Sequence, residues 1–209
     1  MTKKKLIIIG AGGFSKSIID SLDEHQYILE GFIDSYKTGT HQGYPIISQN
    51  ISNIHTPDDY VYFIGIGDPI IRHQFLVLLK ENNLELINII DSTAILSKSV
   101  NLGSGIYIGK MSIINSGTTI LDGAVINTRA LIEHGNTIGI CSNISTNVVL
   151  NGDVNVGHKT FIGSCTVVNG QIDIGERTII GSGSVVIRNI PNNVVVAGSP
   201  TRLIRENIE

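Results

Sequence analysis

The chain has 209 residues, a formal net charge of -3, two cysteines, no tryptophan and 42% apolar residues. These figures indicate a globular protein and exclude a disulfide-built scaffold, and the acidic balance argues against nucleic acid as a partner. The first apolar run, residues 6–9, is far shorter than the roughly 20 residues of a membrane span and shorter than a signal-peptide core, so we expect a cytoplasmic protein without a membrane span.

The first ninety residues are predicted to alternate between strands and helices. Strands are expected at 4–9, 28–34, 61–66 and 86–90, and helices at 14–22 and 75–80. The glycine-rich segment 10–13 forms a tight turn between the first strand and the first helix. Asp34 follows the glycines by about twenty residues, where a ribose-binding acid often lies. This pattern predicts a small, Rossmann-like α/β domain for a sugar nucleotide over residues 1–89.

The dinucleotide fingerprint is incomplete in this domain. Ser15 stands in place of the last glycine, and the sequence contains no second half that would hold a second nucleotide. We therefore do not expect a nicotinamide enzyme.

From residue 90 an aliphatic residue occurs at every sixth position without a break, from Ile90 to Val186. A period of six fits neither a helix nor a hairpin sheet. It predicts a parallel β-helix over residues 90–190, in which three hexapeptides make one triangular coil of eighteen residues. Nine of the eleven aromatic residues precede residue 90, as so narrow a prism requires. After Pro191 the period ends, and we expect a short, basic, helical tail over residues 191–209.

Adding or subtracting eighteen residues shows which side chains lie above one another. On two of the three faces the residue after the aliphatic one is mostly glycine, which we assign to tight corners. The third face differs, and its column reads Ser97, Asn115, Glu133, Asn151 and Asn169. The neighbouring column places His134 beneath Gly152 and Gly170, which predicts an open slot beside an imidazole. An asparagine ladder with an incidental surface histidine is the alternative interpretation.

A metal site is not expected in the repeat. His158 is the only other histidine there, and a zinc hydratase of the β-helix class needs a third histidine ligand. The sequence therefore predicts chemistry without a metal.

Taken together, these motifs resemble those of the hexapeptide acetyltransferases of bacterial surface-sugar and capsule polysaccharide synthesis. The resemblance covers nearly the whole chain and rests on the unbroken hexapeptides and on segments 9–14, 31–34, 125–134 and 196–200. Within that family the chain is most similar to the sialic acid O-acetyltransferases of the NeuD type, with the N-acetyltransferases of nucleotide-linked 4-amino sugars as close relatives. The resemblance implies a left-handed β-helix, a homotrimer, and acetyl-CoA bound as co-substrate between neighbouring β-helices.

The resemblance also implies the roles of individual residues. His134 matches the catalytic base and is flanked by Asn127 and Glu133. The positions that match the surroundings of the acetyl-CoA thioester and pantetheine are Asn143, Gly152, Ser164 and Ser182. The positions that match the nucleotide site of the acceptor are Gly12, Gly13, Phe14, Asp34, Ser35 and Gly67.

Three positions depart from the relatives. Gly135 stands where many relatives have an acidic residue that raises the basicity of the histidine. Either another carboxylate, such as Glu133, orients the ring, or the acceptor makes a smaller demand on the base. Relatives that act on amino sugars often have histidine in place of Phe14 and a second aspartate in place of Ser35, so these two differences favour a sialic acid, free or cytidine-linked, as the acceptor.

We therefore predict an acetyl-CoA-dependent enzyme that O-acetylates sialic acid by direct attack. In this mechanism His134, the position that matches the base of the relatives, is the general base, and we expect the backbone N–H of Gly152 to stabilise the oxyanion. An N-acetyltransferase of a nucleotide-linked 4-amino-4,6-dideoxy sugar is one alternative. The other is a non-catalytic trimeric scaffold of sialic acid synthesis.

Overall fold

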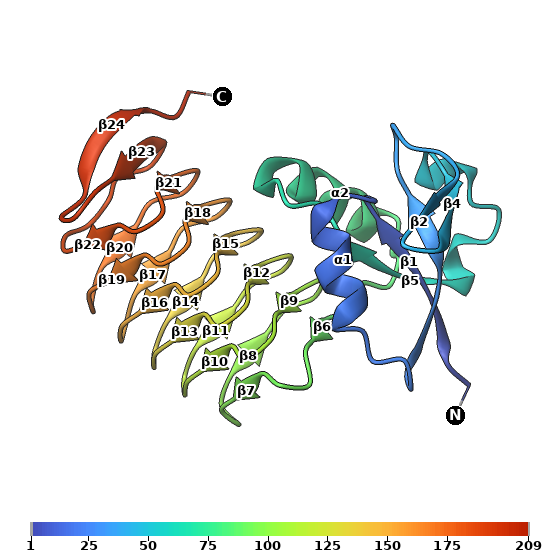
Figure 1. Cartoon of the computed structure of the whole chain (residues 1–209), viewed down its shortest axis with the longest axis horizontal. Coiled ribbons are helices and arrows are strands. Elements are labelled where there is room, and N and C mark those ends of the chain that lie inside the picture. Colours follow the sequence, from blue (N-terminus) through green and yellow to red (C-terminus); the bar gives the residue numbers. More distant parts are fainter. Residues whose placement is uncertain (1, 209) are drawn as a thin grey trace.

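The computed structural model describes residues 2–208, which form an α/β domain followed by a long triangular prism (Figure 1). The α/β domain has a five-stranded sheet of order β3-β4-β2-β1-β5, parallel except for the β3–β4 pair. Its strands are β1 (Lys4–Ile9), β2 (Tyr27–Ile33), β3 (Thr40–His41), β4 (Tyr44–Ser48) and β5 (Val61–Ile64). Its helices are α1 (Gly13–Asp20), α2 (Pro69–Glu81) and two 3₁₀ turns at Ile51–Asn53 and Pro57–Asp59.

Three of the four strands and both helices predicted for this domain are present, most with shifted bounds. The strand predicted at 86–90 does not join this sheet, because Leu86 forms only an isolated bridge with Tyr62 and Ile89–Ile90 belongs to the prism, and strands β3 and β4 were not predicted.

Helix α2 begins six residues before its predicted start. The side chain of Asp68 accepts hydrogen bonds from the N–H groups of Ile70 and Ile71 at 2.8 and 2.9 Å. Pro69 occupies the first helical position, where its missing N–H costs nothing. This Asp-Pro start signal in the sequence sets the beginning of the helix more reliably than its apolar spacing does.

The prism has three sheets, which we name faces A, B and C in the order in which the chain visits them. Face A contains β6 (Ile89–Ile90), β9 (Tyr107–Ile108), β12 (Val125–Ile126), β15 (Asn143–Ile144), β18 (Phe161–Ile162), β21 (Ile179–Ile180), β23 (Val194–Ala197) and β24 (Arg202–Glu206). Face B contains β7 (Ile95–Leu96), β10 (Ile113–Ile114), β13 (Leu131–Ile132), β16 (Val149–Leu150), β19 (Val167–Val168) and β22 (Val185–Val186). Face C contains β8 (Asn101–Leu102), β11 (Thr119–Ile120), β14 (Thr137–Ile138), β17 (Asn155–Val156) and β20 (Asp173–Ile174).

The strands of each face pair in parallel with a register of eighteen residues, as in Ile113 with Leu131. The second residue of each two-residue strand points inward, and from Ile108 to Val186 these residues are buried in one continuous core. The predicted β-helix and its coil length are therefore confirmed. We call the three edges of the prism AB, BC and CA, after the faces that meet there. The division of the chain at residues 89/90 and 190/191 stays a proposal.

The glycines that follow the inward aliphatic residues have a different reason from the predicted one. The positive φ angles, between 52° and 73°, occur two residues later, at every sixth position from Gly105 to Gly183, and most of these positions are not glycine. Gly163, in the predicted corner column, lacks a positive φ, but a β-carbon there would lie 2.5 Å from the backbone nitrogen of Ser182 in the next coil. Close approach of successive coils, and not a left-handed turn, requires glycine at these positions.

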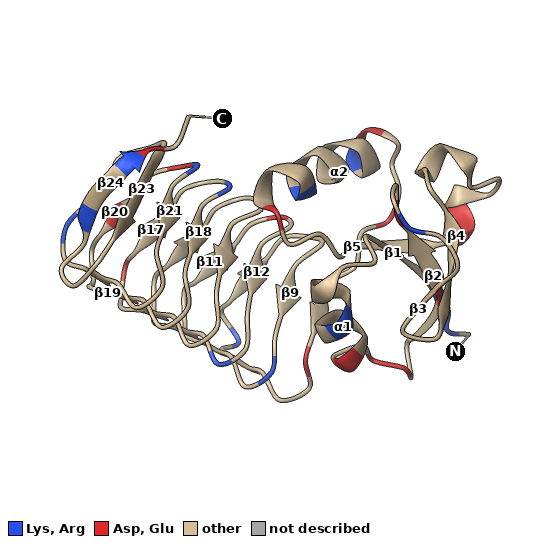
Figure 2. Cartoon of the chain, turned by 45° about the horizontal axis from the view of Figure 1, so that its top comes forward, with Lys and Arg blue, Asp and Glu red and all other residues tan. Residues whose placement is uncertain are grey.

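The predicted helical tail is wrong. Strand β23 joins face A in parallel with β21, and β24 turns back to pair with β23 in an antiparallel hairpin. The free edge of β23 offers backbone hydrogen bonds to the five residues of β24. The same five residues would form almost no backbone hydrogen bonds in an isolated helix of one turn. Figure 2 shows the basic positions of this hairpin at the end of the prism farthest from the α/β domain.

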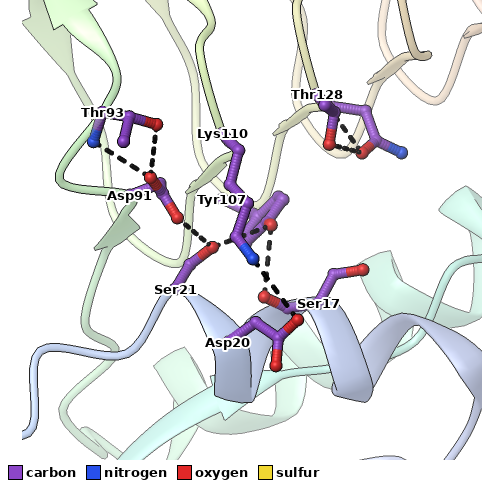
Figure 3. Close-up of polar contacts among 9 residues, drawn as sticks. Ser17, Asp20, Ser21, Asp91, Thr93, Tyr107, Lys110 and Thr128 are labelled. Carbon is purple, nitrogen blue, oxygen red and sulfur yellow. Dashed lines mark hydrogen bonds and ion pairs between the residues drawn. The ribbon is translucent and has the colours of Figure 1, made fainter.

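The α/β domain packs on face A, where Tyr107 and Val125 share one apolar cluster with Leu6, Ile8 and other residues of the domain. Helix α1 meets the prism through a buried polar network (Figure 3). Ser21 Oγ donates to Asp91 at 2.7 Å and lies 3.2 Å from the Tyr107 hydroxyl. On the other side of the domain, Lys80 of α2 forms an ion pair with Asp122 at edge CA. Among the described residues, no helix is long and apolar enough to span a membrane.

Acid is expected to weaken this junction. Burial raises the pKa of the Asp91 carboxyl, but hydrogen bonds from Thr93 and Ser21 outweigh burial and hold the pKa below its ordinary value. The pKa of Asp91 in the folded state therefore lies below the unfolded value of about 3.9. The stability that the ionised carboxylate provides is complete above about pH 3.9 and is lost as the pH falls through the folded pKa. We expect a constant unfolding midpoint from about pH 7 to 5 and a fall below about pH 4.

Calorimetry of the wild type and of Asp91→Asn between pH 3 and 7 would check this expectation. The variant should be less stable at neutral pH and should show a shallower fall in acid, whereas Asp58→Asn, at an exposed position, should follow the wild type. Parallel acid limbs for wild type and Asp91→Asn would contradict it.

Candidate functional site

All six residues predicted to hold the acceptor line one cavity of about 620 Å³ in the α/β domain. The cavity opens where β1, β2 and β5 end, at the carboxyl edge of the parallel strands, which is the usual ligand position in such sheets. Its lining includes Gly12, Gly13, Phe14, Asp34, Ser35 and Gly67, together with Tyr36 and Phe75.

Asp34 holds the glycine turn in place. One carboxylate oxygen accepts the N–H of Ala11 at 2.8 Å, and the other accepts the N–H groups of Tyr36 and Lys37, each at 3.0 Å. Burial raises the pKa of Asp34, but these three N–H donors outweigh burial and lower it below its ordinary value. Asp34 is therefore a fixed negative charge that shapes the cavity.

Ser15, which replaces the last glycine of the fingerprint, stabilises the glycine turn through its hydroxyl group. Its hydroxyl is buried, donates to the carbonyl of Gly12 at 2.7 Å and lies 2.9 Å from His41 Nε2. Burial lowers the pKa of His41, and the charges of Lys37 and Lys16 lower it further, so the ring is neutral at pH 7. His41 therefore has a structural role in the turn. The sequence pattern alone pairs this histidine with no partner.

A second cavity, of about 450 Å³, lies between helix α1 and edge AB of the prism. It shares Phe14 and Gly67 with the first cavity, so the two cavities are neighbours. The Phe14 ring, which lines both cavities, packs edge to face on Tyr107 with ring centroids 5.1 Å apart. From the prism, the second cavity is lined by Asn127, Asn143, Ser145 and Ser164, three of which were predicted as site residues.

Asn143 is anchored by Arg72, a fully buried side chain of helix α2 that the sequence did not single out. The guanidinium donates to Asn143 Oδ1 and to the carbonyls of Gly123 at 2.8 Å and Cys141 at 2.7 Å, and so joins α2 to edge CA. The Asn143 amide in turn donates to the carbonyl of Gly67 at 2.8 Å. Both polar atoms of the Asn143 side chain are thus bonded within the chain. The bond to Gly67 holds the backbone of a residue that lines both cavities.

His134 lies elsewhere, on edge BC, where its side chain is 62% exposed. A β-carbon on Gly152 would lie 2.5 Å from His134 Cε1 and 2.7 Å from Nε2, so the ring is seated directly beneath this glycine. The missing side chain of Gly152 therefore leaves room for the imidazole, and the open slot beside the ring stays a prediction. Glu133 turns toward the coil below, where it accepts a hydrogen bond from Asn115 at 3.0 Å.

The predicted site residues of the prism thus fall on two different edges. Asn127, Ser164 and Ser182 follow strands of face A and lie on edge AB, whereas His134, Glu133 and Gly152 follow strands of face B and lie on edge BC. Edge BC is the edge opposite face A, which the α/β domain covers. Among the described residues, no three His, Cys, Asp or Glu side chains are grouped to hold a metal ion.

Comparison with known proteins identifies relatives for both parts of the chain. Residues 5–79 match the PglD N-terminal domain. A curated relative, an uncharacterized protein of Acanthamoeba polyphaga mimivirus, is 35% identical over 106 residues. That match covers 50% of this chain but 21% of the viral protein, so the chain spans about a fifth of the length of the curated relative it matches.

Solved structures are similar along nearly the whole chain. The acetyltransferase domain of PglB from Neisseria gonorrhoeae FA1090 is 26% identical, with a TM-score of 0.91 over 97% of this chain and 100% of that chain. The same domain is also known in complex with acetyl coenzyme A. PerB from Caulobacter crescentus, in complex with CoA and GDP-perosamine, is 29% identical, with a TM-score of 0.90 over 95% of this chain and 96% of that chain. The predicted resemblance to hexapeptide-repeat sugar acetyltransferases is confirmed, and the narrower likeness to the NeuD type stays a prediction.

Proposed function

We propose that the chain is an acetyl-CoA-dependent sugar acetyltransferase that N-acetylates a nucleotide-linked amino sugar. The observation that carries the proposal is the position of His134, an exposed imidazole directly beneath a glycine whose missing side chain leaves room for the ring. The nucleotide-type cavity of the α/β domain supports an acceptor with a nucleotide handle. The bound CoA and GDP-perosamine of PerB support the same pair of substrates.

The two halves of this site lie on opposite sides of one chain. The first cavity lies in the α/β domain and the second lies between helix α1, face A and edge AB, whereas the base lies on edge BC, across the prism. An acceptor held in the cavities therefore reaches the base of a second copy, and the complete site needs two copies of the chain.

Face B supports a trimer that would bring these edges together. Its outward side chains form an aliphatic column of Ile95, Ile113, Leu131, Val149, Val167 and Val185. The outward column of face C is polar and consists of Asn101, Thr119, Thr137, Asn155 and Asp173. An uncovered apolar sheet face of this length is typical of an interface. In a closed threefold ring with face B inward, edge AB of each copy meets edge BC of the next, and acetyl-CoA would lie in the groove between them.

The chemistry of such a site is direct acyl transfer. The acceptor amine attacks the thioester carbonyl, a C–N bond forms, and its proton passes to the unprotonated ring nitrogen of His134. The carbonyl oxygen becomes negative as it accepts electrons, and the backbone N–H of Gly152 is the donor that we assign to it. The C–S bond then breaks, the thiolate of CoA leaves, and the proton held by His134 neutralises it.

The trimer gives a prediction for face B. Val149→Lys places a charge in the middle of the aliphatic column and should convert the trimer to monomers, because a lysine cannot be buried there without a partner. Light scattering coupled to gel filtration would measure the change. Thr137→Lys, the matched change on polar face C, should leave the mass unchanged. A wild-type protein that is monomeric at micromolar concentration would contradict the trimer.

A second acceptor class, sialic acid, is favoured by two positions of the first cavity. Phe14 and Ser35 stand where amino-sugar relatives often have histidine and aspartate. In this alternative the attacking atom is a hydroxyl oxygen of sialic acid or its cytidine-linked form, and the same base takes its proton.

One assay separates these acceptors. The release of thiol from acetyl-CoA is measured with GDP- and UDP-linked 4-amino sugars, with sialic acid and with its cytidine-linked form. We expect turnover with an amino sugar and an amide product by mass spectrometry. Turnover with sialic acid alone, giving a base-labile ester, would favour O-acetylation. No thiol release with any of them would favour a non-catalytic scaffold.

A further inference from the structure

The space beside Gly135 is filled by a carboxylate from the next coil. Asp153 follows Gly135 by eighteen residues and therefore lies directly above it on edge BC. A β-carbon on Gly135 would collide with Oδ1 of Asp153. The residue after the histidine thus has no side chain, and the carboxylate of Asp153 reaches down into the place that a side chain there would enter.

This carboxylate is next to the imidazole. Asp153 Oδ1 lies 3.8 Å from His134 Nδ1, and both side chains are more than half exposed. The other nitrogen, Nε2, lies closer to the side-chain-free face of Gly152 than Nδ1 does. The ring is therefore oriented with Nδ1 toward the carboxylate and Nε2 toward Gly152.

Hydrogen bonds of the backbone and of Asn136 hold Asp153 beside His134. Its backbone N–H donates to the carbonyl of His134 at 2.9 Å. Below the turn, the buried side chain of Asn136 donates to the carbonyls of Glu133 and His134 and accepts the N–H of Val154 at 3.0 Å. The two turns that carry the imidazole and the carboxylate are thus held together by backbone and amide hydrogen bonds.

No other carboxylate of edge BC competes for this nitrogen. Glu133 is bonded to Asn115 in the coil below. The remaining charged residues in the same columns are Lys98, two coils below His134, and Arg188, three coils above it.

We propose that Asp153 is the positioning residue of the base: its carboxylate faces Nδ1 of His134 at ion-pair distance, 3.8 Å, and so keeps Nε2 free to take the proton of the acceptor. This inference rests on the proposed acetyl transfer. During the reaction the acceptor proton moves to Nε2, the Nδ1 proton stays on the ring, and the ionised carboxylate stabilises the resulting imidazolium. The role held in many relatives by the residue after the histidine is taken here by a residue nineteen positions later.

The test uses three variants of the full chain. Asp153→Asn should lower kcat about 10- to 100-fold and leave the KM for acetyl-CoA within about two-fold, as expected for a partner that orients a functional histidine. The double variant Gly135→Asp with Asp153→Gly should regain most of kcat, since aspartate tolerates the left-handed backbone at residue 135. Asp173→Asn, an exposed carboxylate on face C, is the matched control and should behave like the wild type.

An unchanged kcat in Asp153→Asn, in an enzyme that loses turnover in His134→Ala, would overturn the positioning role and leave the proposed function intact. A fall in kcat that the double variant does not relieve would also overturn it. If His134→Ala keeps full turnover, the proposed function itself fails, and the two failures are therefore distinguishable.

Discussion

Replacement of His134 by alanine is expected to lower kcat by about 10² to 10⁴. The imidazole lies directly beneath Gly152, and in the proposed mechanism its removal leaves the acceptor without a group to take its proton. Because the side chain is 62% exposed, the fold should not change. Steady-state thiol release, with circular dichroism and the native mass measured on the same sample, checks both parts of the expectation.

The matched control for this experiment is His158→Ala. His158 occupies the same hexapeptide position on the next edge, where its Nδ1 accepts the N–H of Ile140 at 2.9 Å. Its replacement should cost some stability and leave kcat within a few-fold of the wild type. A His134→Ala enzyme that turns over as fast as His158→Ala would remove the base from the mechanism.

Replacement of Arg72 by methionine is expected to destabilise the protein by about 3 to 5 kcal/mol, because it leaves several buried carbonyls without donors. The guanidinium bonds to two backbone carbonyls of the prism and two of its own domain, as well as to Asn143. Burial lowers its pKa from the ordinary value to about 10, so the group remains charged at neutral pH. In a chain of this size the loss corresponds to a fall of about 10 °C in Tm.

Calorimetry of Arg72→Met measures this fall, and Arg205→Met, at an exposed position of β24, is the control that should change Tm by about 1–2 °C at most. Because Arg72 also holds Asn143 and Gly67, the variant should raise the KM for the acceptor more than that for acetyl-CoA. An Arg72→Met protein with the Tm of Arg205→Met would contradict the role of this side chain as the link between the two parts.

The prism could be predicted from the sequence because its register is rigid. A coil of eighteen residues places Gly152 over His134 by addition alone, and the structure has the glycine there. The same addition applied to Gly135 gives Asp153, so the signal for the carboxylate was present in the sequence as well. Aliphatic residues at every sixth position leave no other way to bury the core.

Other features depend on contacts that no period encodes. Arg72 is buried only because helix α2 packs against edge CA, and an arginine within a helix gives no sign of such packing. The distribution of the site over edges AB and BC follows from which face the α/β domain covers. The tail forms a strand because β23 offers it an unpaired edge, which is a property of the neighbouring segment and not of residues 202–206.

The eighteen-residue register also limits how this protein can change in length. Loss or gain of a single hexapeptide between His134 and Ser164 would rotate everything above it by one face, so that residues of edge AB would move to another edge. Their order in the sequence would be kept, but they would no longer face the same neighbour. Insertions that preserve the site must therefore add whole coils of eighteen residues or bulge outward at a turn. The edge on which a residue lies is thus determined by its sequence separation from the other residues of the site.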